Sequence, residues 1–123
     1  MLLVEDDDLS TKVMGRIFRN DFEIFNCDSA NEFYEKHNNT NFDIIIMDVS
    51  LNGTKNGLEL IKEIKELPLF NGTPILCFTA HAQDKMRQKA FESGADYFIT
   101  KPISNKILID TVNFLLEPNF HKN

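Results

Sequence analysis

The sequence predicts an α/β protein: a doubly wound sheet of five parallel strands with helices on both faces, in (βα)5 order. Short runs of β-type residues alternate with segments of helical periodicity from one end of the chain to the other. The run at residues 42–47 is almost continuously apolar, which is typical of a central strand buried on both faces. A chain of 123 residues has room for one core but not two, so we expect one domain over residues 1–118 and a short polar tail at 119–123.

The individual elements follow from this alternation. Leu9, Val13 and Ile17 recur at helical spacing, and residues 58–67 form a second apolar stripe of the same period. Five β-type segments separate the helical ones, at residues 2–4, 22–26, 42–47, 74–78 and 96–99.

Capping residues mark the ends of the remaining helices. The pattern Ser29-x-x-Glu32 is a capping box, which starts a helix that runs to about His37. Gly94 suits the left-handed end of the helix that begins near Gln83. Ser104 is the expected N-cap of the last helix.

The charge balance excludes some functions. Nineteen acidic and thirteen basic residues give a net charge of −6, which repels phosphate backbones and anionic lipid. We therefore expect no direct nucleic acid binding and no membrane association. The chain turns acidic after four residues and has no apolar run that spans a bilayer, so we expect a cytoplasmic protein. Cys27 and Cys77 show no metal-ligand spacing and are expected to be reduced core thiols.

Polar residues follow four of the five predicted strands. The acid run Glu5–Asp8 follows the first strand, Asp48 the third, Thr79 the fourth and Lys101 the fifth. Each has an ordinary explanation by itself, since acids complement the start of a helix and threonine is common in strands. All four, however, fall at the carboxyl ends of parallel strands, where ligands bind in such sheets. We expect three carboxylates, one hydroxyl and one ammonium group to converge there.

Such a cluster indicates a particular chemistry. Carboxylates a few ångströms apart repel one another unless a hard divalent cation neutralises them, and Mg²⁺ is the natural occupant. An aspartate beside Mg²⁺ can act as a nucleophile on phosphorus, while a lysine and a hydroxyl balance the phosphoryl oxygens. The sequence therefore predicts phosphoryl transfer to an aspartate.

These residues resemble those of the response regulator receiver domains of two-component signalling, of the chemotaxis-regulator type, over practically the whole chain. The matching motifs are Leu3-Val4-Glu5-Asp6, Ile46-Met47-Asp48, Phe78-Thr79-Ala80, and Gly94-Ala95-Asp96 leading to Lys101-Pro102. The intervals of 42, 31 and 22 residues between Asp6, Asp48, Thr79 and Lys101 also fit the family. The resemblance implies the flavodoxin-like strand order 2-1-3-4-5.

The resemblance implies a role for each acid in the cluster. Asp48 would be the phosphoacceptor and a metal ligand, Asp6 a direct ligand, and Glu5 an outer ligand acting through water. Ser50 would offer its backbone carbonyl to the metal. The cofactor would be Mg²⁺, with Mn²⁺ as an alternative.

The resemblance also implies a switch. Thr79 would hydrogen-bond a phosphoryl oxygen, and Lys101 would pair with another oxygen and with Asp48; the peptide bond from Lys101 to Pro102 would be cis. Phe98 stands where the family has an aromatic residue, usually tyrosine, that moves between outward and inward rotamers. Core packing alone is the other explanation of Phe98.

By the same resemblance, a histidine kinase or histidine phosphotransfer protein would supply the phosphoryl group. Phosphorylation would change the face of the fourth helix, fifth strand and fifth helix for an unknown downstream protein. The domain would not be an enzyme with a separate substrate, since it catalyses only its own phosphorylation and dephosphorylation. Ser50 and His81 would influence the phosphoryl lifetime, with a plain surface histidine as the alternative for His81. Asp7 and Asp8 match no ligand position and are interpreted as helix-start acids.

The sequence fits three other classes of protein less well than the receiver domains. A haloacid-dehalogenase-type phosphatase would have Asp-x-Asp where this chain has Asp48-Val49-Ser50. A cofactor-binding flavodoxin-like module would have a phosphate-cradling loop where this chain has four acids. A pseudo-receiver that only binds protein would be expected to lack the acceptor or the acid pair. The chain could be a stand-alone regulator or a receiver cut from a larger protein such as a hybrid kinase.

Overall fold

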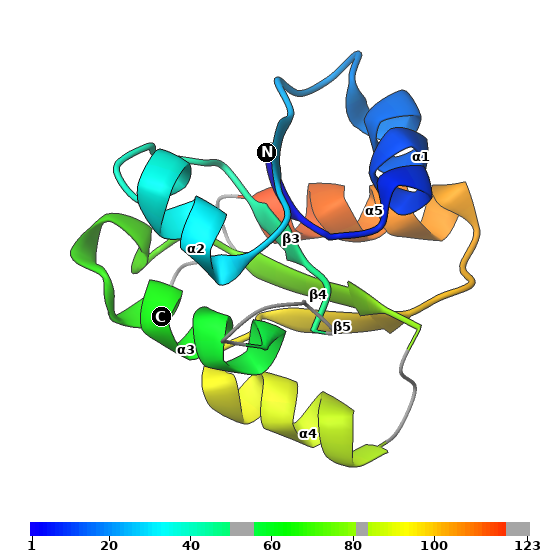
Figure 1. Cartoon of the computed structure of the whole chain (residues 1–123). Coiled ribbons are helices and arrows are strands. Elements are labelled where there is room, and N and C mark those ends of the chain that lie inside the picture. The colour runs from blue at the N-terminus through cyan, green and yellow to red at the C-terminus, as the bar shows by residue number, and fades with distance from the viewer. Residues whose placement is uncertain (50–55, 81–83, 118–123) are drawn as a thin grey trace.

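A computed structural model describes residues 1–49, 56–80 and 84–117, and it contains the predicted parallel sheet (Figure 1). The strands are hydrogen-bonded in the order β2-β1-β3-β4-β5, all parallel, which confirms the predicted doubly wound topology. Their bounds are β1 Leu2–Val4, β2 Phe25–Cys27, β3 Ile45–Met47, β4 Ile75–Thr79 and β5 Tyr97–Thr100.

Helices cover both faces of this sheet, with α1 and α5 on one side and α2, α3 and α4 on the other (Figure 1). The α-helices are α1 Asp8–Phe18, α2 Ala30–Glu32, α3 Gly57–Glu66, α4 Asp84–Ser93 and α5 Asn105–Leu116. A π-helical turn, η1 Phe33–His37, continues α2, and a 3₁₀ turn, η2 Pro68–Phe70, follows α3. No helix within the described ranges is long and apolar enough to cross a membrane.

Alternation along the strands divides the core in two. Leu2 and Val4 belong to the cluster beneath α2, α3 and α4, whereas Leu3 belongs to the cluster beneath α1 and α5. The central strand β3 is buried on both faces, as its continuous apolar run predicts. This alternation also decides which face of the sheet each residue beyond a strand end will occupy.

Capping residues begin the helices largely as expected. The Asp7 carboxylate accepts the backbone N–H of Ser10, 2.8 Å away, and begins α1. Ser104 accepts the N–H of Ile107 at 3.2 Å and begins α5, which confirms that N-cap. Gly94 has a φ of +117° after α4, a backbone conformation that residues with a side chain rarely adopt.

The second strand and second helix differ from the prediction. Phe22 does not begin β2, because its N–H donates to the carbonyl of Phe18 and its ring packs edge-on against the Phe18 ring. The Ser29 hydroxyl accepts the Glu32 N–H, but the Glu32 carboxylate accepts from Asp28 rather than from Ser29, so the capping box is only half formed. The helix then widens into the π-turn that ends at His37, which periodicity did not predict.

Both cysteines are buried and unpaired, as expected. Burial raises the pKa of the Cys27 thiol and of the Cys77 thiol to about 12, because a thiolate loses hydration in the core. Neither thiol is therefore ionised near neutral pH in the structure as it stands.

Candidate functional site

Backbone hydrogen bonds extend the sheet one residue past three strands and thereby position the candidate site. The N–H of Glu5 donates to the Cys27 carbonyl at 2.8 Å, and the N–H of Asp48 donates to the Val4 carbonyl at 2.9 Å. The N–H of Lys101 donates to the Thr79 carbonyl at 2.8 Å. These side chains thus leave β1, β3 and β5 at the same edge of the sheet, because all the strands are parallel.

The ammonium group of Lys101 lies between the carboxylates. Its Nζ is 3.7 Å from Glu5 Oε1 and 3.9 Å from Asp48 Oδ2. The peptide bond from Lys101 to Pro102 is cis, as expected. One cation therefore faces at least two carboxylates, which leaves the cluster with an excess of negative charge.

The hydroxyl predicted for this edge also reaches Asp48. Thr79 is completely buried, and its Oγ1 donates to Asp48 Oδ1 at 3.1 Å. Asp48 thus has a hydroxyl at one carboxylate oxygen and an ammonium group facing the other. This is the arrangement that receives a negatively charged group at a carboxylate.

Glu5 shows most clearly how close the acids lie. Its side chain is only 6% exposed, and burial together with the neighbouring Asp48 raises the pKa of Glu5 to about 8. Lys101 opposes this rise, and Asp6 adds to it. Burial and Asp48 therefore outweigh Lys101, so the pKa of Glu5 stays well above its ordinary value.

Phe98 lies on the same face of the sheet as Thr79. It pairs in register with Cys77, which is two residues before Thr79 on β4, so Thr79 and Phe98 are diagonal neighbours. Phe98 is 4% exposed and packs in the core beneath α3 and α4. Thr79 already points to Asp48 and Phe98 is already buried, so the outward rotamer remains a prediction.

Two contacts of Lys101 were not predicted. Its Nζ lies 3.5 Å from Ser10 Oγ, in the first turn of α1, and 5.1 Å from the centroid of the Phe78 ring. Phe78 directly precedes Thr79 and so points to the other face, where α1 packs; alternation could have placed it there. The position of Ser10 depends on how α1 crosses the sheet, which periodicity does not supply.

Gly57 is a further residue that the sequence did not single out for the site. A Cβ at this position would lie 2.5 Å from the carbonyl oxygen of Asp48 and 2.5 Å from Cα of Val49. The N–H of Gly57 also donates to the Val49 carbonyl at 3.1 Å. The start of α3 is therefore packed directly on the backbone at Asp48, and only glycine allows this approach.

The remaining predicted residues divide into two groups. Asp7 caps α1 and Asp8 lies in its first turn, which confirms both as helix-start acids. Ser50 and His81 lie outside the described residues, so their predicted roles at the metal and in the phosphoryl lifetime stay predictions.

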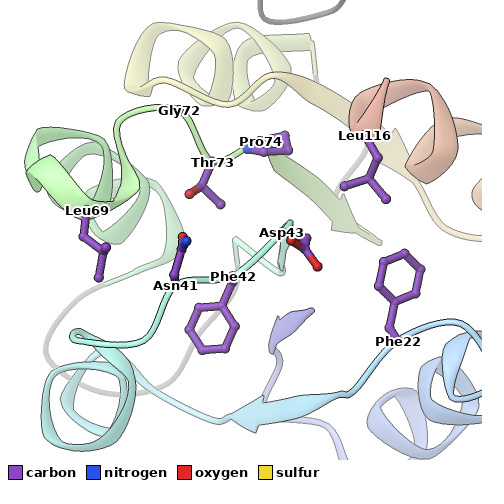
Figure 2. Close-up of a pocket in the computed structure, with 9 residues that line it drawn as sticks. All are labelled: Phe22, Asn41, Phe42, Asp43, Leu69, Gly72, Thr73, Pro74 and Leu116. Carbon is purple, nitrogen blue, oxygen red and sulfur yellow. The ribbon is translucent and has the colours of Figure 1, made fainter. Parts of the chain in front are cut away.

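A separate pocket lies at the opposite edge of the sheet (Figure 2). It has a volume of about 430 Å³, and Asp43, Thr73 and Pro74, which line it, precede β3 and β4. None of the predicted site residues that the structure describes lines it. The pocket is therefore unrelated to the acid cluster, which lies at the carboxyl ends.

The chain matches the family model of the response regulator receiver domain over residues 1–113. It therefore belongs to this family, the receiver domains of two-component response regulators. The regulatory protein VanRB of Enterococcus faecalis is similar, with 36% identity over 117 residues that cover 94% of this chain and 51% of VanRB. The chain thus spans about half the length of the curated relatives it matches.

Solved structures agree on the fold. The BeF3-activated receiver domain of DrrB is similar with a TM-score of 0.84 and 26% identity, over 94% of each chain. The receiver domain of the sensor histidine kinase PA1611 from Pseudomonas aeruginosa, solved with a magnesium ion in its active site cleft, also has a TM-score of 0.84. It is 22% identical over 94% of each chain and shows the fold alone.

Proposed function

We propose that Asp48 is the phosphoacceptor of this receiver domain and that a phosphohistidine on a histidine kinase or a histidine phosphotransfer protein supplies the phosphoryl group. The observation that carries the proposal is the pair of contacts at Asp48: the Thr79 hydroxyl at 3.1 Å from one carboxylate oxygen and the Lys101 ammonium at 3.9 Å from the other.

The reaction exchanges one bond to phosphorus for another. A carboxylate oxygen of Asp48 forms the new P–O bond, the P–N bond to the donor imidazole breaks, and its electron pair stays on the imidazole. Lys101 and Thr79 lie where they can pair with the oxygens of the transferred group. Later attack by water on phosphorus releases inorganic phosphate and restores the carboxylate, which is the proposed self-catalysed dephosphorylation.

The residues present fit a hard divalent cation. The cluster offers oxygen ligands only, and after burial it is the neighbouring Asp48 and Asp6 carboxylates that raise the pKa of Glu5. Asp6 and Asp48 would hold Mg²⁺ directly, Glu5 through water, and Ser50 through its carbonyl, with Mn²⁺ as a substitute. When bound, the ion neutralises the acids and the incoming phosphoryl oxygens. The magnesium ion in the PA1611 receiver domain supports this assignment.

The donor has a surface to approach beside the site. A groove of about 290 Å³ between α1 and α5 borders Lys101, and Leu9 and Val13 of α1 line it. Leu9 is 71% exposed, an unusual position for so large an apolar side chain. An amphipathic helix that carries the phosphohistidine could cover this groove while its imidazole reaches Asp48.

Phosphorylation would act on the output through Thr79 and Phe98. A phosphoryl group on Asp48 would compete for the Thr79 hydroxyl, and Phe98 lies diagonal to Thr79 beneath α4. We propose that this pair reshapes the face of α4, β5 and α5 for a downstream protein partner, in the cytoplasm and without nucleic acid or membrane contact by this domain. The domain boundary at residue 118 is part of the proposal.

Intact-mass spectrometry tests the acceptor. The wild type, Asp48→Asn and Asp8→Asn are incubated with a small acyl-phosphate donor, with and without Mg²⁺. We expect one added phosphoryl mass that requires Mg²⁺, is absent in Asp48→Asn and is retained in Asp8→Asn, an exposed acid in the same region. An adduct that persists in Asp48→Asn would contradict the assignment. No adduct in the wild type, when a control receiver is labelled, would favour a protein-binding pseudo-receiver.

A further inference from the structure

A second cluster of ligand-type side chains lies at the end of β2, apart from the acid cluster. Ligand atoms of Cys27, Glu32 and His37 all lie within 4.8 Å of one another. Cys27 ends β2, Glu32 ends α2 and His37 ends the π-turn. The receiver chemistry proposed above uses none of the three.

The π-turn brings two of these residues together. Glu32 and His37 are five residues apart, a spacing that diverges on an α-helix and aligns on a π-helix. An α-helical period does not place Glu32 and His37 on one face, so the sequence pattern does not reveal the cluster. Cys27 is 1% exposed and His37 is 9% exposed, so the thiol and the imidazole face each other inside the protein and not in solvent.

The neighbours of the cluster hold its members in place. The ring Nε2–H of His37 donates to the carbonyl of Asn26 at 3.2 Å, a tautomer that keeps the Nδ1 lone pair for another partner. Histidine ligands of metals ordinarily donate their second N–H to a carbonyl or carboxylate in this way. The Glu32 carboxylate accepts the Asp28 N–H at 2.9 Å, which orients it toward the end of β2.

We infer that Cys27, Glu32 and His37 form a binding site for a thiophilic divalent cation, of which Zn²⁺ is the type. One thiolate, one imidazole and one carboxylate are the ligands that Zn²⁺ prefers, with water at the fourth position. Tetrahedral zinc at ordinary bond lengths separates its ligand atoms by about 3.3–3.8 Å. Atoms that lie within 4.8 Å reach that spacing by small side-chain movements.

The site differs in chemistry from the acid cluster. Sulfur and nitrogen ligands select Zn²⁺ over Mg²⁺, which prefers oxygen and retains its water. When the sulfur–metal bond forms, the thiol proton leaves to the solvent, and the thiol's hydrogen bond to the Ser29 carbonyl, 3.1 Å long, is lost. Lys36 competes for the carboxylate, since its Nζ is 3.3 Å from Glu32 Oε2, but its side chain is 63% exposed and free to move away.

Spectroscopic titration with Co²⁺ tests this inference on the whole chain. Co²⁺ bound by a thiolate gives a near-ultraviolet charge-transfer band, which the oxygen-only acid cluster cannot give. The titration is run in excess Mg²⁺ to occupy that cluster, and Zn²⁺ is then added to displace Co²⁺. We expect one equivalent of Co²⁺ with this band and its loss on addition of Zn²⁺.

Cys77 supplies a matched control, because it is also a buried free cysteine and lies outside the cluster. Cys27→Ser should abolish the band, whereas Cys77→Ser should retain it. Glu32→Gln, at a partly exposed position, should keep the fold and lower the affinity for Zn²⁺ about tenfold or more, and Lys36→Met should raise it several-fold.

The result that would overturn the inference is the absence of the band in the folded wild type, or a band that Cys77→Ser removes and Cys27→Ser does not. If Cys27→Ser fails to fold, the Glu32→Gln and Lys36→Met affinities decide: unchanged affinity in both overturns the site.

Discussion

Replacing Glu5 by glutamine should remove a pH dependence of folding stability that the wild-type chain shows when no metal ion is present. The pKa of Glu5 is about 8 in the folded protein, against an ordinary value of 4.5. Between these values the folded chain holds one proton more than the unfolded chain. Stability is therefore highest at the acidic end of this window and falls as the pH rises through it.

The magnitude follows from this single proton. One proton of difference changes the free energy of unfolding by about 1.4 kcal/mol per pH unit. From about pH 5.5 to about pH 7.5 the wild type should lose about 2–3 kcal/mol through Glu5. Solvent screening reduces this free energy only slightly, because the Glu5 side chain is 6% exposed. Glutamine has nearly the same shape, carries no charge and can still donate to Asp48.

Urea unfolding in the presence of EDTA, at a series of pH values, measures the effect. The free energy of unfolding of Glu5→Gln should change less steeply with pH than that of the wild type, by the slope that corresponds to about one proton. The control Asp8→Asn should have the same slope as the wild type. Saturating Mg²⁺ should flatten the wild-type curve too, because a bound cation takes the place of the proton. Parallel curves for the wild type and Glu5→Gln without metal would show that the pKa of Glu5 is not raised in the folded protein.

Three further substitutions, one of them with a matched control, test other parts of the structure. Gly57→Ala should lower both stability and the rate of phosphorylation, whereas Gly15→Ala, which meets nothing within 4 Å in the middle of α1, should stabilise by about 0.5–1 kcal/mol in urea unfolding. Phe98→Ala should lower the free energy of unfolding by about 3–5 kcal/mol and weaken the effect of phosphorylation on partner affinity; an unchanged effect would contradict the switch. Asp96→Ala should cost about 1–2 kcal/mol by thermal or urea unfolding, since it removes both the 3.0 Å ion pair with Lys65 and the 2.8 Å hydrogen bond from the Ile75 N–H; no loss would show that water replaces these contacts.

The sequence predicts the sheet and the edge where the acids meet because both depend on short-range rules. Apolar runs define the strands, and parallel strands bring their carboxyl ends together whatever the helices do. Asp48, Thr79 and Lys101 are therefore found from their places directly after strands or close to them. The approach of Gly57 to the Asp48 backbone could not be found this way, because it depends on how α3 lies against the sheet.

The cluster of Cys27, Glu32 and His37 could not be predicted from the sequence for a different reason. The spacing of Cys27 and His37 fits no common zinc motif, so the sequence does not predict that they meet. The π-turn decides this contact, and π-turns occur where tertiary packing overrides the local preference for α-helix. Here His37 is packed edge-on against Phe25 and Phe42, which accounts for its inward position at the end of the turn.

The two cation sites would not be independent if both are occupied. The Cys27 carbonyl accepts the N–H of Glu5 at 2.8 Å, so the residue that binds the thiophilic ion also holds the backbone of the buried acid. A metal at Cys27 would restrain the end of β2 and thereby the place of Glu5 beside Asp48. Zn²⁺ at low concentration should then alter the apparent Mg²⁺ affinity of the wild type and leave that of Cys27→Ser unchanged. Linkage requires Mg²⁺ to alter the Zn²⁺ affinity by the same factor, so titrating each ion at fixed concentrations of the other separates coupling from simple competition for the acids.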